Sequence, residues 1–284
     1  IIDGKKIASD LRAELTEEIG RLKDQGITPT LALIQVGEGN GSGLYVKRKA
    51  EACEGMGMHP ILKVLGEESR EEDVIELIRK FNEDRDAHGI MVQLPLPSHI
   101  NPYKVTSTIT LEKDVDGLNP ASLGALIMGR ECFTAAGAEA AREILHRSGI
   151  TFQDQHVVVA GASEILGKPF AALMINEGAV VTICPSRIKR LESYTKLADI
   201  LLVDLGAPHA VNREMVKKGC AIIDAGNNRV EGKLLGDVDF DQVKDVASAI
   251  TPVPGGLGPV IIMMLMKNLL RAARRQTLPA NTMV

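Results

Sequence analysis

Tyr45 and Lys49 stand four residues apart in the run from Ser42 to Lys49, and together they could act on a small molecule. If the segment is helical, residues four apart lie on one face, so a flat aromatic ring and a titratable ammonium group can meet the same ligand. The alternative is a solvated basic helix face, from Lys47 to Lys49, with Tyr45 half-buried.

Composition favours a small-molecule partner. The 284 residues are 45% hydrophobic and 25% charged, which is ordinary for a globular protein, and the length predicts about two domains. A net charge of −4 disfavours nucleic acid as the main partner, because neutralising phosphates requires a basic surface. The longest apolar stretch, from Val260 to Met266, is too short to span a bilayer, so no membrane association is expected.

Cysteine and histidine spacing argues against a metal site and a disulfide framework. The four cysteines are widely scattered and form no C-x-x-C pair, and the six histidines show no ligand spacing. No Walker loop or G-x-S-x-G elbow occurs either. Unpaired cysteines fit a reducing compartment, and we expect a cytoplasmic location.

Alternating helices and strands must position Tyr45 and Lys49. Apolar residues at helical spacing predict three helices in the first half, over 7–23, 44–56 and 71–82. Short apolar runs over 31–36 and 89–93 predict buried strands. The second run ends at Gln93, before two prolines that cannot continue inside a sheet, so a catalytic side chain could stand at this strand end.

The second half repeats the rhythm as a β-α-β unit. A strand over 157–160 leads through a turn into a helix over 169–177 and a strand over 179–184. Three further buried strands are predicted over 200–203, 221–224 and 249–251, followed by a long helix over 257–275. This order predicts a parallel sheet with a ligand at its carboxyl edge.

The predicted fold class is α/β, with two domains. An N-terminal α/β catalytic domain is expected over 1–137, and a Rossmann-like, doubly wound dinucleotide-binding domain over 138–261. The C-terminal helix, within 262–284, is expected to pack back on the first domain.

The turn after the first strand of the second domain suits a dinucleotide. Gly161 and Gly167 would let backbone amides and a helix N-terminus face a pyrophosphate, although the spacing is not G-x-G-x-x-G. The next strand ends without the acidic residue that selects NAD. Ser186 and Arg187 follow it and would suit the extra phosphate of NADP; a basic surface turn is the alternative.

Several segments, taken in order, resemble the bifunctional methylenetetrahydrofolate dehydrogenase/methenyltetrahydrofolate cyclohydrolase family. They are Ile2-Asp3-Gly4-Lys5-Lys6-Ile7-Ala8, the helix Ser42-x-x-Tyr45-x-x-x-Lys49, Val92-Gln93-Leu94-Pro95-Leu96-Pro97, Lys113-Asp114-Val115-Asp116-Gly117, Gly236-Asp237-Val238-Asp239-Phe240, and the loop from Thr251 to Pro259. The resemblance covers essentially the whole chain.

The resemblance implies two reactions on tetrahydrofolate derivatives. These are hydride transfer from 5,10-methylenetetrahydrofolate to NADP, with NAD possible, and hydrolysis of the methenyl product to 10-formyltetrahydrofolate. Tyr45 would stack on the folate and Asp116 would accept hydrogen bonds from the pterin. Lys49 would transfer protons, with burial and a hydrogen bond from Gln93 favouring its neutral form. The resemblance also implies a homodimer built through the cofactor domains.

The remaining candidate residues follow from matching positions. Ser42 belongs to the catalytic set, and the loop residues Pro254, Gly255 and Gly256 would bind substrate. The cofactor set comprises Gly161, Ala162, Ser163, Gly167, Ser186, Arg187, Asp204, Asn227, Gly258 and Ile261.

Departures from the family pattern are expected on the cofactor side. Where many members have Pro-Cys-Thr-Pro, this chain has Cys132-Phe133-Thr134-Ala135, and Asp204, Asn227 and Ile261 replace family residues. An ionised Asp204 would repel dinucleotide phosphates unless it is paired. Two alternatives therefore stand beside the bifunctional enzyme: a cyclohydrolase with weak or lost dehydrogenase activity, and a non-catalytic folate-binding paralogue.

Overall fold

The chain divides into two units in a computed structural model that describes residues 1–37 and 42–277. Unit 1 comprises Ile1–Asp10 and Gly137–Met264, and unit 2 comprises Leu11–Ala136 and the chain from Leu265 onward. The boundaries fall inside the first helix, α1 (Gly4–Lys23), and the last, α10 (Leu257–Thr277). Each unit therefore contains part of both terminal helices.

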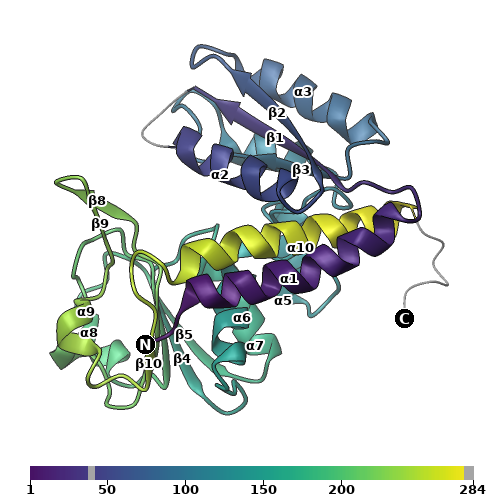
Figure 1. The fold of residues 1–284 in the computed structure, drawn as a ribbon. Helices are drawn as coiled ribbons and strands as arrows, with labels where there is room; N and C mark the ends of the chain where they lie inside the picture. The colour runs from purple at the N-terminus through teal and green to yellow at the C-terminus, as the bar shows by residue number, and fades with distance from the viewer. Residues whose placement is uncertain (38–41, 278–284) are drawn as a thin grey trace. The chain divides into compact units, whose positions relative to one another are not determined.

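Unit 2 is built on a three-stranded parallel sheet in the order β2-β1-β3. Its strands are β1 (Thr30–Val36), β2 (His59–Leu65) and β3 (Gly89–Val92). Figure 1 shows α2 (Ser42–Glu54) and α3 (Glu71–Glu83) on opposite faces of this sheet. Every residue of β1 is buried, as its apolar sequence predicts for a central strand covered on both faces.

Strand β2 is absent from the sequence-based expectation. It contains Pro60 and Lys63, and most of its residues are exposed or half-buried. Proline cannot donate to a sheet ladder and is confined to edges, where β2 lies. The position of the strand at the sheet edge therefore explains its weak sequence pattern and why proline is tolerated in it.

Two short helices in unit 2 begin with the same local device. Asn101 precedes α4 (Pro102–Thr108), and Asn119 precedes α5 (Pro120–Ile127). The Asn101 side chain accepts from Tyr103 N at 2.9 Å, and Asn119 accepts from Ala121 N at 2.8 Å. An asparagine cap followed by proline satisfies the first helical amides and pre-sets the backbone, so both starts are locally encoded.

Unit 1 is built on a five-stranded parallel sheet in the order β10-β7-β6-β4-β5. The strands are β4 (His156–Ala160), β5 (Val180–Cys184), β6 (Ile200–Val203), β7 (Ala221–Asp224) and β10 (Ala249–Ile250). The chain passes from β4 to β5 on one side and then crosses to β6 on the other. The strand order therefore reverses at β4, which makes the carboxyl ends of β4 and β6 the topological switch point of this sheet. A crevice for ligands is expected there.

Helices and a hairpin complete unit 1. They are α6 (Ala136–Arg147), α7 (Gly167–Asn176), the short α8 (Glu192–Thr195) and α9 (Phe240–Val243), a 3₁₀ turn η2 (Arg213–Met215), and the hairpin of β8 (Asn228–Val230) and β9 (Lys233–Leu235). Helix α7 connects β4 to β5, which confirms the predicted β-α-β unit and the α/β fold class.

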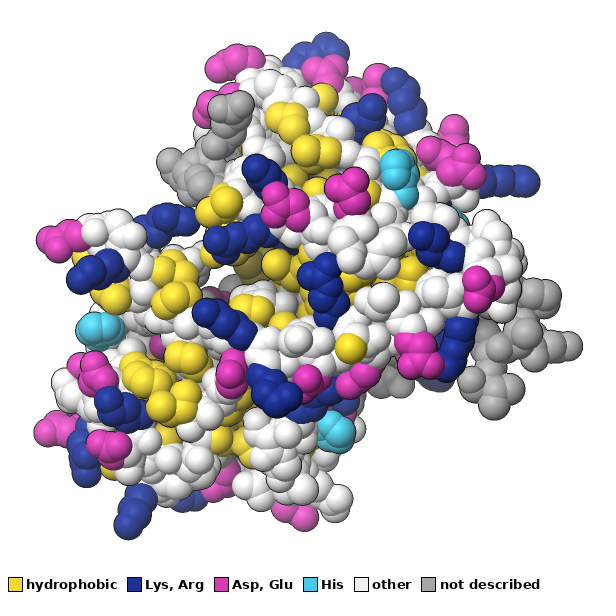
Figure 2. Space-filling view, viewed as in Figure 1, with side chains coloured by type: hydrophobic (Ala, Val, Ile, Leu, Met, Phe, Trp, Pro, Cys, Tyr) yellow, Lys and Arg dark blue, Asp and Glu magenta, His cyan; other side chains and the backbone are white. Residues whose placement is uncertain are grey.

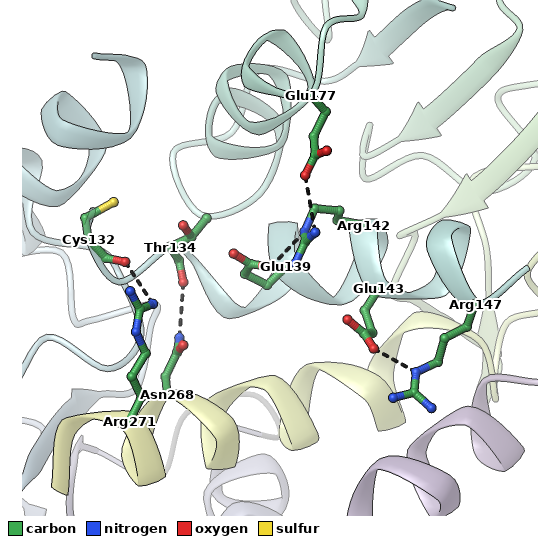
Figure 3. Close-up of polar contacts among 9 residues, drawn as sticks. All are labelled: Cys132, Thr134, Glu139, Arg142, Glu143, Arg147, Glu177, Asn268 and Arg271. Atoms are coloured by element: carbon green, nitrogen blue, oxygen red, sulfur yellow. Dashed lines mark hydrogen bonds and ion pairs between the residues drawn. The ribbon is translucent and has the colours of Figure 1, made fainter. Parts of the chain in front are cut away.

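Arg142 links two helices of unit 1. Its guanidinium contacts Glu139 on its own helix, α6, at 3.1 Å, and Glu177 at the end of α7 at 3.2 Å (Figure 3). One turn further along α6, Glu143 pairs with Arg147 at 2.7 Å. The bond from Arg142 to Glu177 therefore connects α6 to the end of α7, and the bond to Glu139 fixes the direction of the Arg142 side chain.

Charged side chains of both signs are mixed over the face that Figure 2 displays. A protein that binds nucleic acid through phosphates presents a continuous basic surface instead.

Candidate active site

Lys49 is held on helix α2 with Tyr45 one turn before it, as the spacing predicts. Lys49 is only 9% exposed, whereas Tyr45 is half-buried. A solvated basic face would leave Lys49 in water, so burial argues against that alternative for this residue. Ser42 begins the same helix, and its side chain lies outside the described part of the structure.

Gln93 meets Lys49 at the end of β3. Lys49 Nζ donates to Gln93 Oε1 at 3.0 Å, and Gln93 Nε2 donates to Leu94 O at 2.6 Å. The expected direction was therefore wrong: Gln93 accepts from Lys49 and does not donate to it. Burial lowers the pKa of Lys49 below its ordinary value, and the Asp116 carboxylate opposes that shift. The neutral amine is thus favoured by its surroundings and not by Gln93.

Asp116 lies near the same amine. It is partly buried, and burial raises the pKa of its carboxyl to about 6, against the opposing influence of Lys49. Within the described part of the chain, no hydrogen bond holds the Asp116 carboxylate. Its oxygens can therefore accept from a ligand, and the carboxylate shares its surroundings with an amine that can move a proton.

Asp114 has a different role from Asp116, two residues away. Its side chain is 1% exposed and accepts from Leu118 N at 3.1 Å, Asn119 N at 2.9 Å and Ser122 Oγ at 2.7 Å. These bonds hold the turn that leads into α5. Asp114 is thus the structural carboxylate of the pair.

The lysine of the same motif anchors the other end of this loop. Lys113 is 7% exposed, and its Nζ donates to Phe81 O at 2.8 Å and Asp84 O at 2.5 Å. These carbonyls lie at the end of α3, where the last turn leaves acceptors unsatisfied. The loop that carries Asp116 is therefore attached to α3 on one side and to α5 on the other.

In unit 1, the turn after β4 brings backbone segments into unusually close approach. A Cβ on Gly161 would lie 1.9 Å from Asp204 O, and a Cβ on Gly167 would lie 2.2 Å from Gly161 O. Gly161 also has a φ of +121°, which favours glycine. Glycine at both positions lets the end of β4, the start of α7 and the end of β6 meet at the switch point.

Ser163 and Asp204 bridge this switch point. Ser163 Oγ donates to Asp204 Oδ2 at 2.5 Å and accepts from Leu166 N at 3.2 Å and Gly167 N at 3.1 Å. Burial raises the pKa of Asp204, the Ser163 bond opposes that rise, and the nearby Asp237 adds to it. Asp204 is therefore paired, and amides at the start of α7 are already capped by Ser163.

Sequence reasoning missed how two buried aspartates shape the same sheet edge. Asp224 accepts from the backbone N–H groups of Gly226, Asp237 and Val238. Asp237 in turn accepts from the N–H groups of Leu205, Gly206 and Ala207, and from Asn228 Nδ2. An aspartate at the end of a buried strand, just before a turn that contains glycine, was the sequence signal that could have predicted this arrangement. The two carboxylates fix the loops at the carboxyl ends of β6 and β7.

Sequence comparison relates both units to one family. Residues 2–116 match "Tetrahydrofolate dehydrogenase/cyclohydrolase, catalytic domain", and residues 135–277 match "Tetrahydrofolate dehydrogenase/cyclohydrolase, NAD(P)-binding domain". The chain belongs to the tetrahydrofolate dehydrogenase/cyclohydrolase family. This confirms the resemblance inferred from the motifs, on matches that include the Lys49 helix, Asp116 and the switch point of unit 1.

Relatives of this family resemble the chain over nearly their full lengths. "Bifunctional protein FolD" of Brevibacillus brevis is 45% identical over 277 residues, covering 97% of this chain and 98% of its own. A crystal structure of the bifunctional enzyme from Campylobacter jejuni is 40% identical, with a TM-score of 0.94, and covers 96% of this chain and 98% of its own. The Trypanosoma brucei enzyme, solved with NADP cofactor and inhibitor, is 36% identical, with a TM-score of 0.94, and covers 98% of each chain.

The other residues matched to the family's cofactor and substrate sites lie in unit 1. Ser186 and Arg187 are exposed just after β5, and Asn227 is exposed after β7. Ala162 is partly exposed in the turn after β4, and Gly258 and Ile261 lie in the first turns of α10. Pro254 is exposed, Gly255 partly exposed and Gly256 buried in the loop before α10. The four proposed folate-side residues Tyr45, Lys49, Gln93 and Asp116 lie in unit 2.

The cofactor-side place expected for the departure at Cys132 to Ala135 stays a prediction. These residues belong to unit 2, and Gly117 packs directly on them: a Cβ there would lie 2.4 Å from Thr134 C. Phe133 is buried with the guanidinium groups of Arg271 and Arg275 each 5.4 Å from its ring. This departure therefore borders the Asp116 loop.

Neither metal chemistry nor a membrane span is indicated within residues 1–37 and 42–277. No cluster of three or more His, Cys, Asp or Glu side chains in these ranges could hold a metal ion. No helix described there is long and apolar enough to cross a bilayer.

Proposed function

We propose that the chain oxidises 5,10-methylenetetrahydrofolate to 5,10-methenyltetrahydrofolate with NADP and hydrolyses the product to 10-formyltetrahydrofolate. The observation that carries the proposal is the buried Lys49 amine, held by Gln93 beside Asp116, in a family whose relatives are named bifunctional. Binding alone would not need a buried amine whose pKa is lowered, which argues against a non-catalytic paralogue.

Hydrolysis uses the proton-transfer capacity of Lys49. Water adds to the methenyl carbon between N5 and N10, and the neutral Lys49 amine accepts the proton that the water loses. The bond from that carbon to N5 then breaks as the Lys49 ammonium returns the proton to N5, and the hydroxyl group of the adduct releases its own proton to solvent as its oxygen becomes the formyl carbonyl. The formyl group remains on N10, and Gln93 keeps the amine in place through its hydrogen bond.

Substrate recognition divides between stacking and hydrogen bonding. The Tyr45 ring stacks on the folate ring system, and the ionised Asp116 accepts from the pterin amino and ring N–H groups. The loop from Pro254 to Gly256 has no bulky side chains and lets substrate approach the backbone. Ser42 belongs to the same catalytic helix.

On the cofactor side, the glycine-lined turn after β4 suits a dinucleotide. Gly161 and Gly167 let the end of β4, the start of α7 and the end of β6 pack closely at the switch point, and Ser186 and Arg187 stand exposed after β5, where a 2′-phosphate would bind. NADP, when bound, accepts the hydride from the methylene carbon. Gly161, Ala162, Ser163, Gly167, Ser186, Arg187, Asp204, Asn227, Gly258 and Ile261 form the proposed cofactor set.

A paired assay tests the proposal. One arm measures methylenetetrahydrofolate oxidation with NADP and with NAD, and the other measures methenyltetrahydrofolate hydrolysis. Both activities, with NADP preferred, are the expected result. Hydrolysis without oxidation would identify a cyclohydrolase that has lost hydride transfer, and the absence of both would leave only folate binding. Ala at Ser186 and Arg187 should reduce the NADP preference without changing hydrolysis.

The assembly and location are proposed on separate grounds. A homodimer through unit 1 is supported by the edge strand β5, where Val180 is 63% and Ile183 is 42% exposed. A cytoplasmic location is supported by the lack of disulfides among the cysteines of the described residues. Cys53, Cys184 and Cys220 are buried, and burial raises the pKa of each thiol, so they behave as packing residues.

A further inference from the structure

Asn268, in the part of α10 that belongs to unit 2, joins two backbone segments through one amide group. Its side chain is 7% exposed. Asn268 Nδ2 donates to Val115 O at 2.9 Å and to Thr134 O at 3.3 Å, and Figure 3 shows the second bond. Both hydrogens of the amide nitrogen are therefore used on carbonyls of the peptide chain.

The first bond acts on the peptide that leads into Asp116. The Val115 carbonyl and the Asp116 nitrogen share one planar peptide unit, so fixing the carbonyl fixes the plane from which Asp116 departs. The Val115 side chain is fully buried against β3, because a Cβ on Gly89 would lie 2.7 Å from Val115 Cγ1. Val115 is thus held through its side chain by the strand that leads to Gln93 and through its carbonyl by Asn268.

The second bond acts on the other side of Asp116. Gly117 follows Asp116, adopts a φ of +65° and packs on the backbone of Thr134. Asn268 holds the carbonyl of that same residue, Thr134. One buried amide, that of Asn268, therefore bonds both the carbonyl of Val115, before Asp116, and the carbonyl of Thr134, on which Gly117 packs after Asp116.

The Asp116 carboxylate depends on this backbone for its direction. No hydrogen bond to its oxygens is present among the described residues. Asp114 and Lys113 fix neighbouring parts of the loop through their side chains, but neither touches the peptide between Val115 and Asp116. The direction of the carboxylate is thus set by the peptide that Asn268 holds.

We propose that Asn268 is a positioning residue that directs the Asp116 carboxylate toward the pterin of the folate substrate. The role rests on the proposed function, in which Asp116 is the pterin anchor. Loss of the amide would let the peptide rotate and would weaken a hydrogen bond that needs good geometry. Binding would suffer, while proton transfer by Lys49 would continue once substrate is bound.

The variant Asn268→Leu removes both donors at similar side-chain volume. For hydrolysis of 5,10-methenyltetrahydrofolate, KM should rise about tenfold while kcat stays within about twofold, because a charge-assisted hydrogen bond has roughly that weight. Gln276→Leu is the matched control. Gln276 lies on the same helix and also donates one amide nitrogen to two carbonyls, His88 O at 2.7 Å and Glu112 O at 3.1 Å. Its loss should lower the melting temperature without raising KM.

A double-mutant cycle separates positioning from general support. In an Asp116→Ala background, Asn268→Leu should change KM by less than about twofold, because its effect passes through Asp116. A full additional rise in KM in that background would overturn the proposal, as would an equal rise in Gln276→Leu. If Asn268→Leu fails to fold, Asn268→Ser, which leaves room for a bridging water, takes its place in the cycle.

The same cycle distinguishes this proposal from the proposed function. If Asp116→Ala leaves KM unchanged, Asp116 is not the anchor and the role of Asn268 is overturned, while the hydrolysis measured still supports the proposed function; if the parent protein shows no hydrolysis at all, the proposed function fails first. If Asp116→Ala raises KM and Asn268→Leu does not, the anchor stands and the role of Asn268 is overturned.

Discussion

At the residue scale, Lys49 is the group on which hydrolysis depends. Lys49→Met keeps the apolar stem and removes the amine, so hydrolysis should fall by roughly 10²- to 10⁴-fold, the usual weight of a proton-transfer group. Lys47→Met is the matched control, because Lys47 lies on the same helix with a side chain 73% exposed. Steady-state hydrolysis by both variants measures the difference. A folded Lys49→Met enzyme within about tenfold of the parent rate would remove Lys49 from the mechanism.

The raised pKa of Asp116 predicts how folate affinity depends on pH. Above about 6 the free carboxylate is ionised and accepts from the pterin, and below about 6 it is protonated and loses that capacity. Affinity for an unreactive pteridine such as folic acid should therefore fall as pH drops through about 6. In Asp116→Asn this dependence should disappear. Fluorescence titration from acid to neutral pH tests it, and an unchanged profile in Asp116→Asn would assign the titration to another group.

Asp204 combines a charge with a hydrogen bond, and two variants separate them. Asp204→Ala removes both and frees the Ser163 hydroxyl for a phosphate, so NADP affinity should rise, by about fivefold for about 1 kcal/mol of relieved repulsion. Asp204→Asn removes the charge but can still accept from Ser163, and should give a smaller rise. Calorimetric titration of the folate-free protein provides the measurement. Weaker binding in Asp204→Ala would instead make the carboxylate a cofactor ligand, for example to a ribose hydroxyl.

At the element scale, the Asp116 loop contains one aspartate that stabilises the fold and another that is available to bind the ligand. Asp114 satisfies three donors at the entrance to α5, whereas Asp116 is left for ligand. Asp114→Ala should therefore destabilise the fold by about 2–4 kcal/mol, since buried donors would lose their acceptor. Folate affinity should change much less than in Asp116→Ala. Urea unfolding and substrate KM, measured on both variants, provide the comparison, and equal losses of affinity would show that the anchor was misassigned.

At the scale of the whole molecule, each unit has one exposed edge strand with apolar residues. Edge strands present unpaired backbone groups and readily pair with a second copy. We expect light scattering after size exclusion to give twice the 30.5 kDa chain mass, and Val180→Lys in β5 to shift the protein toward the monomer. Leu62→Lys in β2 is the control, because Leu62 is 46% exposed on the edge of the other sheet. A parent protein of monomeric mass would contradict the dimer.

The functional division of the chain at residues 137 and 138 stays a prediction. The structure divides the chain at nearby positions but places the first ten residues with unit 1. The two units are defined by their packing, whereas the predicted domains are defined by the ligand that each would bind. Titration of each ligand with variants from both units, such as Lys49→Met and Asp204→Ala, addresses the functional division directly.

Local sequence was sufficient for several elements and for proposing the site residues. Apolar residues at helical spacing located α2, and short continuous apolar runs located β1, β3 and β4, because their side chains face a core. The spacing of Tyr45 and Lys49 on one helix follows from the geometry of the helix itself. The motifs around Lys49, Gln93 and Asp116 identified the family without any tertiary information.

Tertiary structure decided which atoms meet. The Lys49–Gln93 bond joins side chains 44 positions apart, and the pairing of Asp204 with Ser163 depends on β6 lying beside β4. Asn268 reaches Val115 across 153 positions of sequence. Hydrogen bonds and burial act over a few ångströms between segments that are distant in the chain, so a pattern confined to neighbouring residues specifies the groups but not their partners.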